Sequence, residues 1–360
     1  MKVKFAPKAI LVTCFAVLWF SLLITACKQE QNTNSTNTQL PIVSNPNTDS
    51  STSAYPGVQN AYPGTAPFLP EVPIEQRGII SFDIPAEGIP TFPGKLAFHT
   101  ERYGNLQVAI LDGATGEITR LTQMSGQTFE PAWSSDCANM AFSVGVGVDE
   151  DFEIYIQNMN GDQATPLLAN PDSYDWASSW SPTGNVIAYQ NNRDARINIC
   201  FADPNGTELG CMERGDFSNA MPAWSPDGTQ LVFGSNREGN WELYLTDYPG
   251  MTSLKRLTNN TDIDFTPQFS PDGQTILFSS QRLGTYHLYT YDINSDTEYQ
   301  LTFSGADERT PTWIGNDLIA YSAFIQEDWE LYLVNKDGSN VQRLTYAKGK
   351  DQWPAWCAMP

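Results

Sequence analysis

A motif that returns six times between residues 94 and 360 is the feature that most constrains how this chain folds. Its marker is an aromatic residue at the end of a short strand, in most copies followed by Ser-Pro-Asp-Gly or a variant of it. Proline and glycine at these places are typical of a tight β-turn. The markers, spaced by 47, 44, 45, 44 and 43 residues, are Trp133, Trp180, Trp224, Phe269, Trp313 and Trp356. So regular a period predicts a repeat architecture.

Each repeat carries three further short strands after its marker. Behind Trp224 they are Leu231-Val232-Phe233, Glu242-Leu243-Tyr244 and Arg256-Leu257-Thr258. Segments of the same three types recur in step along the chain, although not every repeat keeps every one. Four strands in about 44 residues correspond to one blade of a β-propeller.

The two ends of the repeat region complement each other. The first repeat begins with its second strand, at Lys95–Phe98, and the chain ends just after a lone first strand, at Trp353–Trp356. Together they supply one composite blade, which would leave no open strand edge exposed. We therefore predict an all-β domain over residues 91–360, a six-bladed β-propeller with circular closure whose composite blade takes its first strand from the C-terminus.

The repeat resembles a known family. The stretch from Pro222 to Thr258 contains Pro-Ala-Trp-Ser-Pro-Asp-Gly, Trp-Glu-Leu-Tyr and Arg-Leu-Thr, and it is similar to the TolB-like (WD40-like) β-propeller repeat. The resemblance covers roughly residues 94–360 and implies a periplasmic or surface propeller that acts as a binding component. The chain differs from TolB itself in carrying a lipobox, and we expect no counterpart of the folded α/β domain that precedes the TolB propeller. Because one fold serves many functions, the resemblance does not fix the ligand.

The N-terminus has the layout of an export signal. Lysines precede an uncharged, apolar stretch from Ala9 to Ala26, and Ile24-Thr25-Ala26-Cys27 resembles the lipobox of bacterial lipoproteins. That resemblance implies a signal peptide over residues 1–26 and a lipid on Cys27. The protein would then be anchored to the bacterial membrane, and Lys28 favours the outer membrane or cell surface. An uncleaved transmembrane anchor is the alternative, since 18 apolar residues nearly span a bilayer.

Residues 27–90 are rich in Ser, Thr, Asn and Pro, a composition that predicts a disordered tether. Removal of residues 1–26 leaves 17 basic against 41 acidic residues, a net charge of −24. Such a chain is a poor partner for nucleic acid and for anionic lipid headgroups. We therefore expect contact with the membrane through the lipid anchor only, and an envelope protein, peptide or glycan as partner.

Four cysteines remain for disulfides once the signal peptide and the lipidated Cys27 are set aside. Export permits disulfides. We predict a bond between Cys200 and Cys211, which face each other on a hairpin, and a second bond between Cys137 and Cys357 at the same end of neighbouring inner strands. The alternative is four buried free thiols.

Little in the sequence indicates catalysis. The mature chain contains two histidines, His99 and His287, which we interpret as structural, and it lacks the Gly-x-Ser-x-Gly motif of a nucleophile elbow. We predict a non-enzymatic binding scaffold without a cofactor. A carbohydrate-active enzyme, a glycosidase or lyase using paired carboxylates, is the alternative.

The candidate binding site comes from aligning the repeats. A polar residue stands five positions before each marker aromatic, and four of the six are acidic: Thr128, Asp175, Asn219, Asp264, Glu308 and Asp351. Aromatic residues follow two of the four acids, Trp176 after Asp175 and Phe265 after Asp264. We expect these residues to ring one mouth of the central channel and to attract a basic peptide or to bind Ca²⁺. The alternative is that each polar side chain caps the backbone of its own loop.

Overall fold

The structure is a computed structural model that describes residues 88–146, 151–161, 163–168, 173–193, 196–212, 215–346 and 348–358. The chain divides into two units, Met1–Tyr62 and Pro63–Pro360, and every described residue lies in the second. The predicted signal peptide, Cys27 and almost all of the predicted tether therefore fall outside the described residues. Within the described ranges, no helix is long and apolar enough to cross a membrane.

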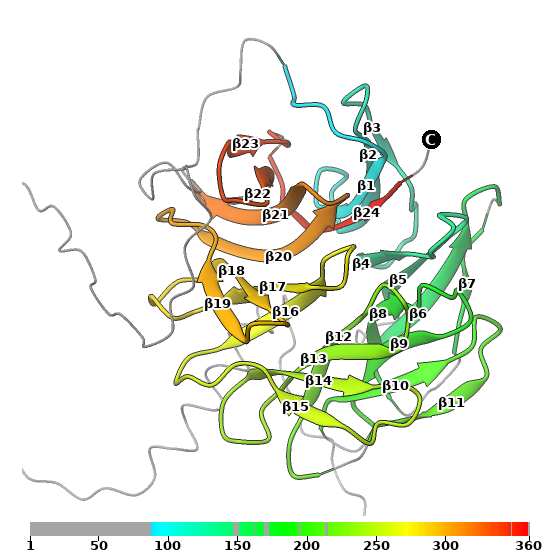
Figure 1. Ribbon diagram of the computed structural model, residues 1–360. Coiled ribbons are helices and arrows are strands. Elements are labelled where there is room, and N and C mark those ends of the chain that lie inside the picture. Colours follow the sequence, from blue (N-terminus) through cyan, green and yellow to red (C-terminus); the bar gives the residue numbers. More distant parts are fainter. Residues whose placement is uncertain are drawn as a thin grey trace, which may run out of the picture. The chain divides into compact units, whose positions relative to one another are not determined.

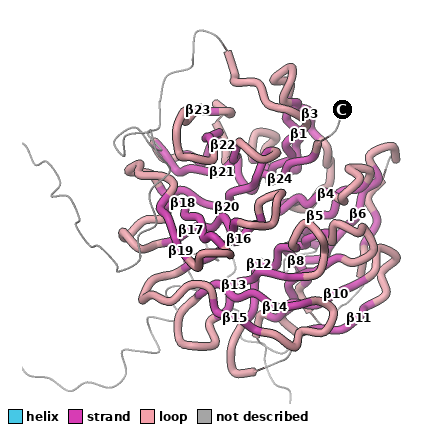
Figure 2. The backbone as a smooth tube through the Cα atoms, in the orientation of Figure 1, coloured by secondary structure: helices cyan, strands magenta, loops and turns pink. Residues whose placement is uncertain are grey.

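The described residues form six four-stranded antiparallel sheets, which we call blades 1 to 6 (Figures 1 and 2). From the inner to the outer strand, blade 1 contains β24 (Asp351–Cys357), β1 (Lys95–Thr100), β2 (Gln107–Asp112) and β3 (Ile118–Arg120). Blade 2 contains β4 (Thr128–Trp133), β5 (Asn139–Val146), β6 (Asp151–Asn158) and β7 (Thr165–Pro166). Blade 3 contains β8 (Asp175–Trp180), β9 (Ile187–Asn191), β10 (Asn198–Ala202) and β11 (Glu208–Cys211).

Blades 4 to 6 follow in chain order. Blade 4 contains β12 (Asn219–Trp224), β13 (Gln230–Ser235), β14 (Glu242–Asp247) and β15 (Leu254–Arg256). Blade 5 contains β16 (Asp264–Phe269), β17 (Thr275–Ser280), β18 (His287–Asp292) and β19 (Thr297–Gln300). Blade 6 contains β20 (Asp307–Ile314), β21 (Leu318–Ile325), β22 (Asp328–Asn335) and β23 (Gln342–Arg343). The prediction of an all-β, six-bladed propeller is confirmed.

The composite blade closes as the sequence predicts. The last strand, β24, pairs antiparallel with the first strand, β1, so that Leu96 lies opposite Trp356 and Lys95 opposite Cys357. Figure 1 shows this red C-terminal strand beside the cyan N-terminal one. Each inner strand also contacts the inner strands of the two neighbouring blades, which completes a ring.

The hydrophobic core consists of six clusters, one between each pair of neighbouring blades. The second strand of each blade contains three consecutive buried apolar residues, because both of its faces are covered. In β1, for example, Leu96 and Phe98 pack towards blade 6, whereas Ala97 packs towards Phe142 of blade 2. The blades are therefore held together by burial of apolar surface on both sides of each sheet.

The recurring Arg-Leu-Thr segment ties the outer strand of a blade to its third strand. In blade 4, Leu257 is buried against blade 5, and the Thr258 hydroxyl accepts a hydrogen bond from the Leu243 amide at 2.9 Å. The Arg256 side chain folds back and its Nε donates to the Thr258 carbonyl at 2.7 Å. The arginine, the leucine and the threonine thus each make a different contact, which explains why the three recur together.

Candidate functional site

The four predicted mouth carboxylates lie at the same end of their inner strands, but they do not reach solvent. Asp175, Asp264 and Asp351 are the first residues of β8, β16 and β24, and Glu308 is the second residue of β20. Each has an exposed fraction of 0%. The expectation of an accessible acidic ring is therefore corrected: these residues lie at the starts of strands rather than in loops, and their side chains are buried.

Two of the carboxylates pair with an arginine of their own blade. Arg102 and Arg282 each stand two residues after the end of the second strand, at β1 and β17. Arg282 Nη2 lies 2.7 Å from an oxygen of Asp264, and Arg102 donates to Asp351. Burial still raises the pKa of Asp351 to about 6, although Arg102 opposes the shift. These charges hold the strands of a blade in register.

The other two carboxylates have different partners. Glu308 lies 3.0 Å from His287 Nδ1 of blade 5, so this pair joins two blades. Asp175 accepts a hydrogen bond from the side-chain amide of Asn191 at 2.5 Å. Burial raises the pKa of Asp175 to about 6. His287 therefore supports a neighbouring carboxylate, in keeping with the structural role expected for it.

The two predicted mouth aromatics are buried as well. Trp176 and Phe265 have exposed fractions of 7% and 8%. Phe265, on β16, packs edge-to-face on Trp241 of blade 4, with ring centroids 4.9 Å apart. A fully packed ring of this kind contributes to the contact between blades and offers little face to a ligand.

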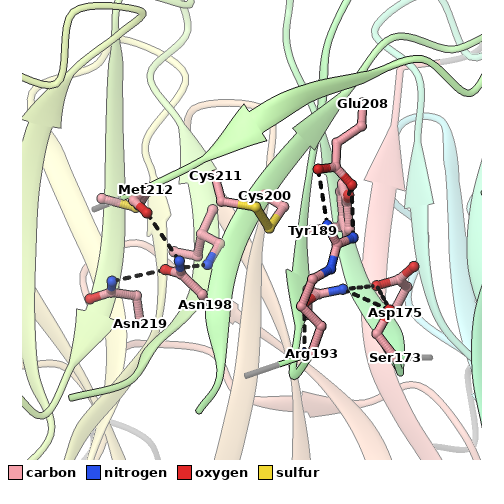
Figure 3. The surroundings of a disulfide bond; sticks show 12 residues. Ser173, Asp175, Tyr189, Arg193, Asn198, Cys200, Glu208, Cys211, Met212 and Asn219 are labelled. Atoms are coloured by element: carbon pink, nitrogen blue, oxygen red, sulfur yellow. Dashed lines mark hydrogen bonds and ion pairs between the residues drawn. A yellow bond between two sulfur atoms is a disulfide. The ribbon is translucent and has the colours of Figure 1, made fainter. Parts of the chain in front are cut away.

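Both predicted disulfides are present. Cys200 on β10 is bonded to Cys211 on β11 (Figure 3), and Cys137 is bonded to Cys357. Cys200 and Cys211 are directly paired in the ladder, the position that Tyr244 and Arg256 hold in blade 4. The second bond joins the turn after β4 to the end of β24, and therefore links blade 2 to the closing strand.

A feature that the sequence analysis missed lies halfway along every inner strand. In each blade the register between the inner strand and the second strand shifts at this point, which marks a β-bulge. One residue per bulge has a left-handed backbone, with φ between 48° and 61°, although none of the six is glycine. They are Glu130, Ala177, Met221, Thr266, Thr310 and Trp353. Such backbone strain persists only where the surrounding structure holds it, and it often marks a functional region.

Hydrogen bonds from the preceding blade hold three of these bulges. The Ala177 amide donates to Ser143 Oγ at 3.2 Å, and the Trp353 amide donates to Ser322 Oγ at 3.1 Å. At the third bulge, the Glu130 amide donates to His99 Nδ1 at 3.3 Å. Burial lowers the pKa of His99 to about 3, which keeps the imidazole neutral and able to accept. His99 is thus structural, as expected.

Glu130 also has a carboxylate role that the sequence did not indicate. Its Oε2 accepts from the Ala177 amide of blade 3 at 3.0 Å and from Ser143 Oγ at 3.2 Å. Burial raises its pKa to about 7. Glu130 therefore clamps two neighbouring inner strands.

The channel between the inner strands holds a cavity of about 330 Å³. It runs from the bulges to the turns after the marker aromatics, at Ser135, Pro182 and Pro226. This is the opposite end of the strands from the predicted mouth. None of its lining residues is charged, and five of the six inner strands place a proline there: Pro131, Pro222, Pro267, Pro311 and Pro354.

Two polar atoms on β8 lie in this lining without a partner. Ser178 Oγ and Trp180 Nε1 are buried and make no hydrogen bond with the described residues. The equivalent indoles of Trp133 and Trp224 instead donate to carbonyls of the preceding inner strand, at 3.0 and 3.1 Å. A buried donor left unpaired is costly, so these two atoms lower the stability of blade 3.

The described residues contain no group of three or more His, Cys, Asp or Glu side chains that could hold a metal ion. The Ca²⁺ site considered from the sequence therefore has no ligand cluster in this part of the chain. Asp175, Asp264 and Asp351 each have one carboxylate oxygen engaged by a donor of their own blade, and Glu308 is bonded to His287 of blade 5.

The fold and the site define a class of protein, a six-bladed β-propeller with an uncharged central cavity. The family described as the TolB beta propeller domain matches residues 210–356. The chain accordingly carries a TolB-like β-propeller.

Individual proteins agree with this assignment. The Tol-Pal system protein TolB of Francisella tularensis is 25% identical over 132 residues, which are 36% of this chain and 30% of that protein. An uncharacterised protein of Agrobacterium fabrum is 29% identical over 107 residues, which are 30% of this chain and 36% of that protein. The matched part thus spans about a third of the length of these relatives.

Solved structures show the same fold. TolB from Acinetobacter baumannii superposes with a TM-score of 0.65 at 22% identity, covering 74% of this chain and 68% of that one. A putative TolB from Agrobacterium tumefaciens gives a TM-score of 0.59 at 19% identity, covering 73% of this chain and 91% of that one.

Proposed function

We propose that this protein is a non-enzymatic binding scaffold of the bacterial envelope, and that a segment of its partner occupies the central cavity. The observation that carries the proposal is the cavity of about 330 Å³, whose lining is wholly uncharged and includes several serine and threonine residues. A concave site with a few convergent polar groups is typical of ligand binding. The partner is an envelope protein, a peptide or a glycan.

The positions of the acidic residues support binding over catalysis. A glycosidase or lyase needs a pair of carboxylates that reach the substrate. The aligned acids Asp175, Asp264, Glu308 and Asp351 have exposed fractions of 0% and hydrogen-bond partners. No acidic residue lines the cavity. The carbohydrate-active alternative is therefore the weaker one.

The location in the envelope rests on two observations. Relatives of the repeat region are named as Tol-Pal system proteins. The Ile24–Cys27 lipobox adds an anchor: a signal peptide over residues 1–26, a lipid on Cys27 and a tether over residues 27–90 that carries the propeller. Lys28 favours the outer membrane or cell surface.

Site-specific photo-crosslinking in the host tests the proposal. A photoreactive amino acid replaces Gln268, which is exposed and lines the cavity, and in a matched control it replaces Leu254, which is 48% exposed on the outer strand β15. We expect a discrete crosslinked partner from position 268 and none from position 254. Crosslinks from the outer strand alone, or none from the cavity, would refute channel binding.

A further inference from the structure

Cys137 occupies a turn position at which three other blades have glycine. It ends the turn after β4, where its amide donates to the Ser134 carbonyl at 2.9 Å, and its backbone is left-handed with φ of 59°. The equivalent residues of blades 3, 4 and 5 have φ between 71° and 75° and are Gly184, Gly228 and Gly273. A side chain in this conformation costs free energy. The turn itself therefore does not explain a cysteine here, whereas its disulfide does.

The disulfide of Cys137 holds the last strand of the propeller. Its partner Cys357 is the final residue of β24 and lies opposite Lys95 in the ladder with β1. Towards blade 2, the Trp133 indole donates to the Ala355 carbonyl at 3.0 Å. The disulfide thus adds a covalent link between the closing strand and the blade beside it.

This disulfide lies at the surface of the molecule. A groove of about 640 Å³ is lined by both cysteines together with Trp133, Met159 and Trp356. Cys137 is partly exposed, whereas Cys357 has an exposed fraction of 7%. A thiol that enters the groove therefore meets the sulfur of Cys137 first.

The other disulfide has a different environment. Cys200 has an exposed fraction of 1%, and both Cys200 and Cys211 pack in the apolar cluster between blades 2 and 3. Neither of them lines the groove. Because access of the attacking thiol limits the rate of disulfide exchange, the two bonds should differ in how fast they are reduced.

We infer that Cys137–Cys357 is a thiol-exchange site, which an external dithiol opens to release the end of the closing strand from blade 2. A thiolate of the dithiol attacks the Cys137 sulfur, the S–S bond breaks, and Cys357 leaves as a thiolate that takes up a proton. The second thiol of the dithiol then attacks the mixed disulfide and releases Cys137 as a thiol. Two electrons pass to the protein, and the dithiol is oxidised to a disulfide. This site does not depend on ligand binding in the channel.

Reduction should loosen one end of β24 without unfolding the propeller. The ladder with β1 remains, and the pair of Arg102 and Asp351 holds the opposite end of the strand. Trp133, Ala355 and Trp356 lie beside the broken bond and also line the channel cavity. The redox state of the disulfide therefore acts on this end of the channel wall.

The test uses the purified full chain under native conditions and two probes, reduced dithiothreitol and reduced thioredoxin. Samples are alkylated over time, and peptide mapping by mass spectrometry assigns the new thiols to the two disulfides. The same reduction in denaturant is the control, because there the fold protects neither bond. Cys200→Ser combined with Cys211→Ser leaves the proposed site as the one propeller disulfide, and hydrogen exchange of its β24 amides is measured before and after reduction.

We expect native Cys137–Cys357 to be reduced about tenfold faster than Cys200–Cys211 or more, and the two to react at similar rates in denaturant. Hydrogen exchange should then rise at residues 355–357 and stay unchanged in β10. Equal native rates, or reduction no faster than global unfolding, overturn the exchange site. Reduction without a rise in exchange overturns the release of the strand. Selective reduction by dithiothreitol alone assigns the site to a small dithiol, and faster selective reduction by thioredoxin assigns it to a protein dithiol.

Discussion

The Arg102 guanidinium donates a hydrogen bond to the Asp351 carboxylate across 249 positions of sequence. Arg102 follows the first strand of the propeller and Asp351 begins the last, so the pair joins the two ends of the propeller inside blade 1. Asp351 has an exposed fraction of 0%. A buried charge without its partner is strongly destabilising, which makes this contact a test of circular closure.

Arg102→Ala should lower the free energy of unfolding by about 3–5 kcal/mol, because it leaves the Asp351 carboxylate buried and uncompensated. Lys336→Ala is the matched control, since Lys336 and Asp317 form an ion pair with exposed fractions of 54% and 79%. Its loss should cost less than about 1 kcal/mol. Denaturant titrations measure the free energy of unfolding of both variants. An equal loss in the two variants would contradict a stabilising contact between Arg102 and the buried Asp351.

The two disulfides should differ in what they contribute to stability. Cys137–Cys357 closes a separation of 220 residues, whereas Cys200–Cys211 closes one of 11. In the chain-entropy account, replacing both cysteines by serine should cost about 5 kcal/mol or slightly more for the long loop and about 3 kcal/mol for the short one. Denaturant midpoints of the two double variants show which disulfide contributes more to stability. A larger loss for Cys200–Cys211 would argue against a closing role for Cys357.

Glu130 should give folding a pH dependence of definite sign. Burial raises its pKa to about 7 from an ordinary value of 4.5. Between these values the folded chain keeps a proton that the unfolded chain releases, so this group's contribution to stability falls as pH rises from 4.5 to about 7. Glu130→Gln keeps an acceptor for the Ala177 amide but cannot titrate. The melting temperature of the variant should therefore exceed that of wild type by more at about pH 8 than at about pH 5.

His99 acts with the opposite sign, because its lowered pKa costs stability as pH falls below 6.5. It is present in both proteins, so its effect cancels in the comparison of wild type with Glu130→Gln. Asp136→Asn serves as the exposed control: hydrogen bonds lower the pKa of Asp136 from its ordinary 3.8, so this carboxyl is ionised at both pH values and its loss should cost the same at both. If the melting temperatures of Glu130→Gln and wild type change in parallel with pH, Glu130 does not have the raised pKa that the prediction requires.

The lipobox makes a prediction about the N-terminus. Cys27→Ser removes the sulfur that would carry the lipid, so radiolabelled fatty acid should no longer enter the protein and signal-peptide cleavage should stop. The matched control is Cys14→Ser, which lies within the predicted signal peptide. Unchanged labelling and membrane fractionation of Cys27→Ser would identify a different anchor.

The fold was predictable because its determinants repeat. The spacing of Trp133, Trp180 and the later markers sets the size of a blade, and the complementary ends at Lys95–Phe98 and Trp353–Trp356 set the closure. The disulfides followed from the same frame, because aligned repeats indicate which strands are neighbours. Local periodicity and turn chemistry were sufficient for these features.

The site was harder to predict, because position along a repeat does not tell which groups reach solvent. Asp264 aligned correctly with the other acids, but its partner Arg282 belongs to a loop whose path the sequence does not show. The bulges had no sequence signal, since residues as different as Ala177 and Trp353 adopt the left-handed backbone.

The central claim is that the partner enters the uncharged cavity, and a single added charge tests it most directly. Gln268→Lys places a cation in the cavity at an exposed position, so the fold should tolerate it, and Leu254→Lys adds the same charge to the outer strand β15. Association with the crosslinked partner is measured for both variants and wild type. The account predicts that Gln268→Lys abolishes association while Leu254→Lys leaves it intact. Undiminished association of folded Gln268→Lys would contradict it.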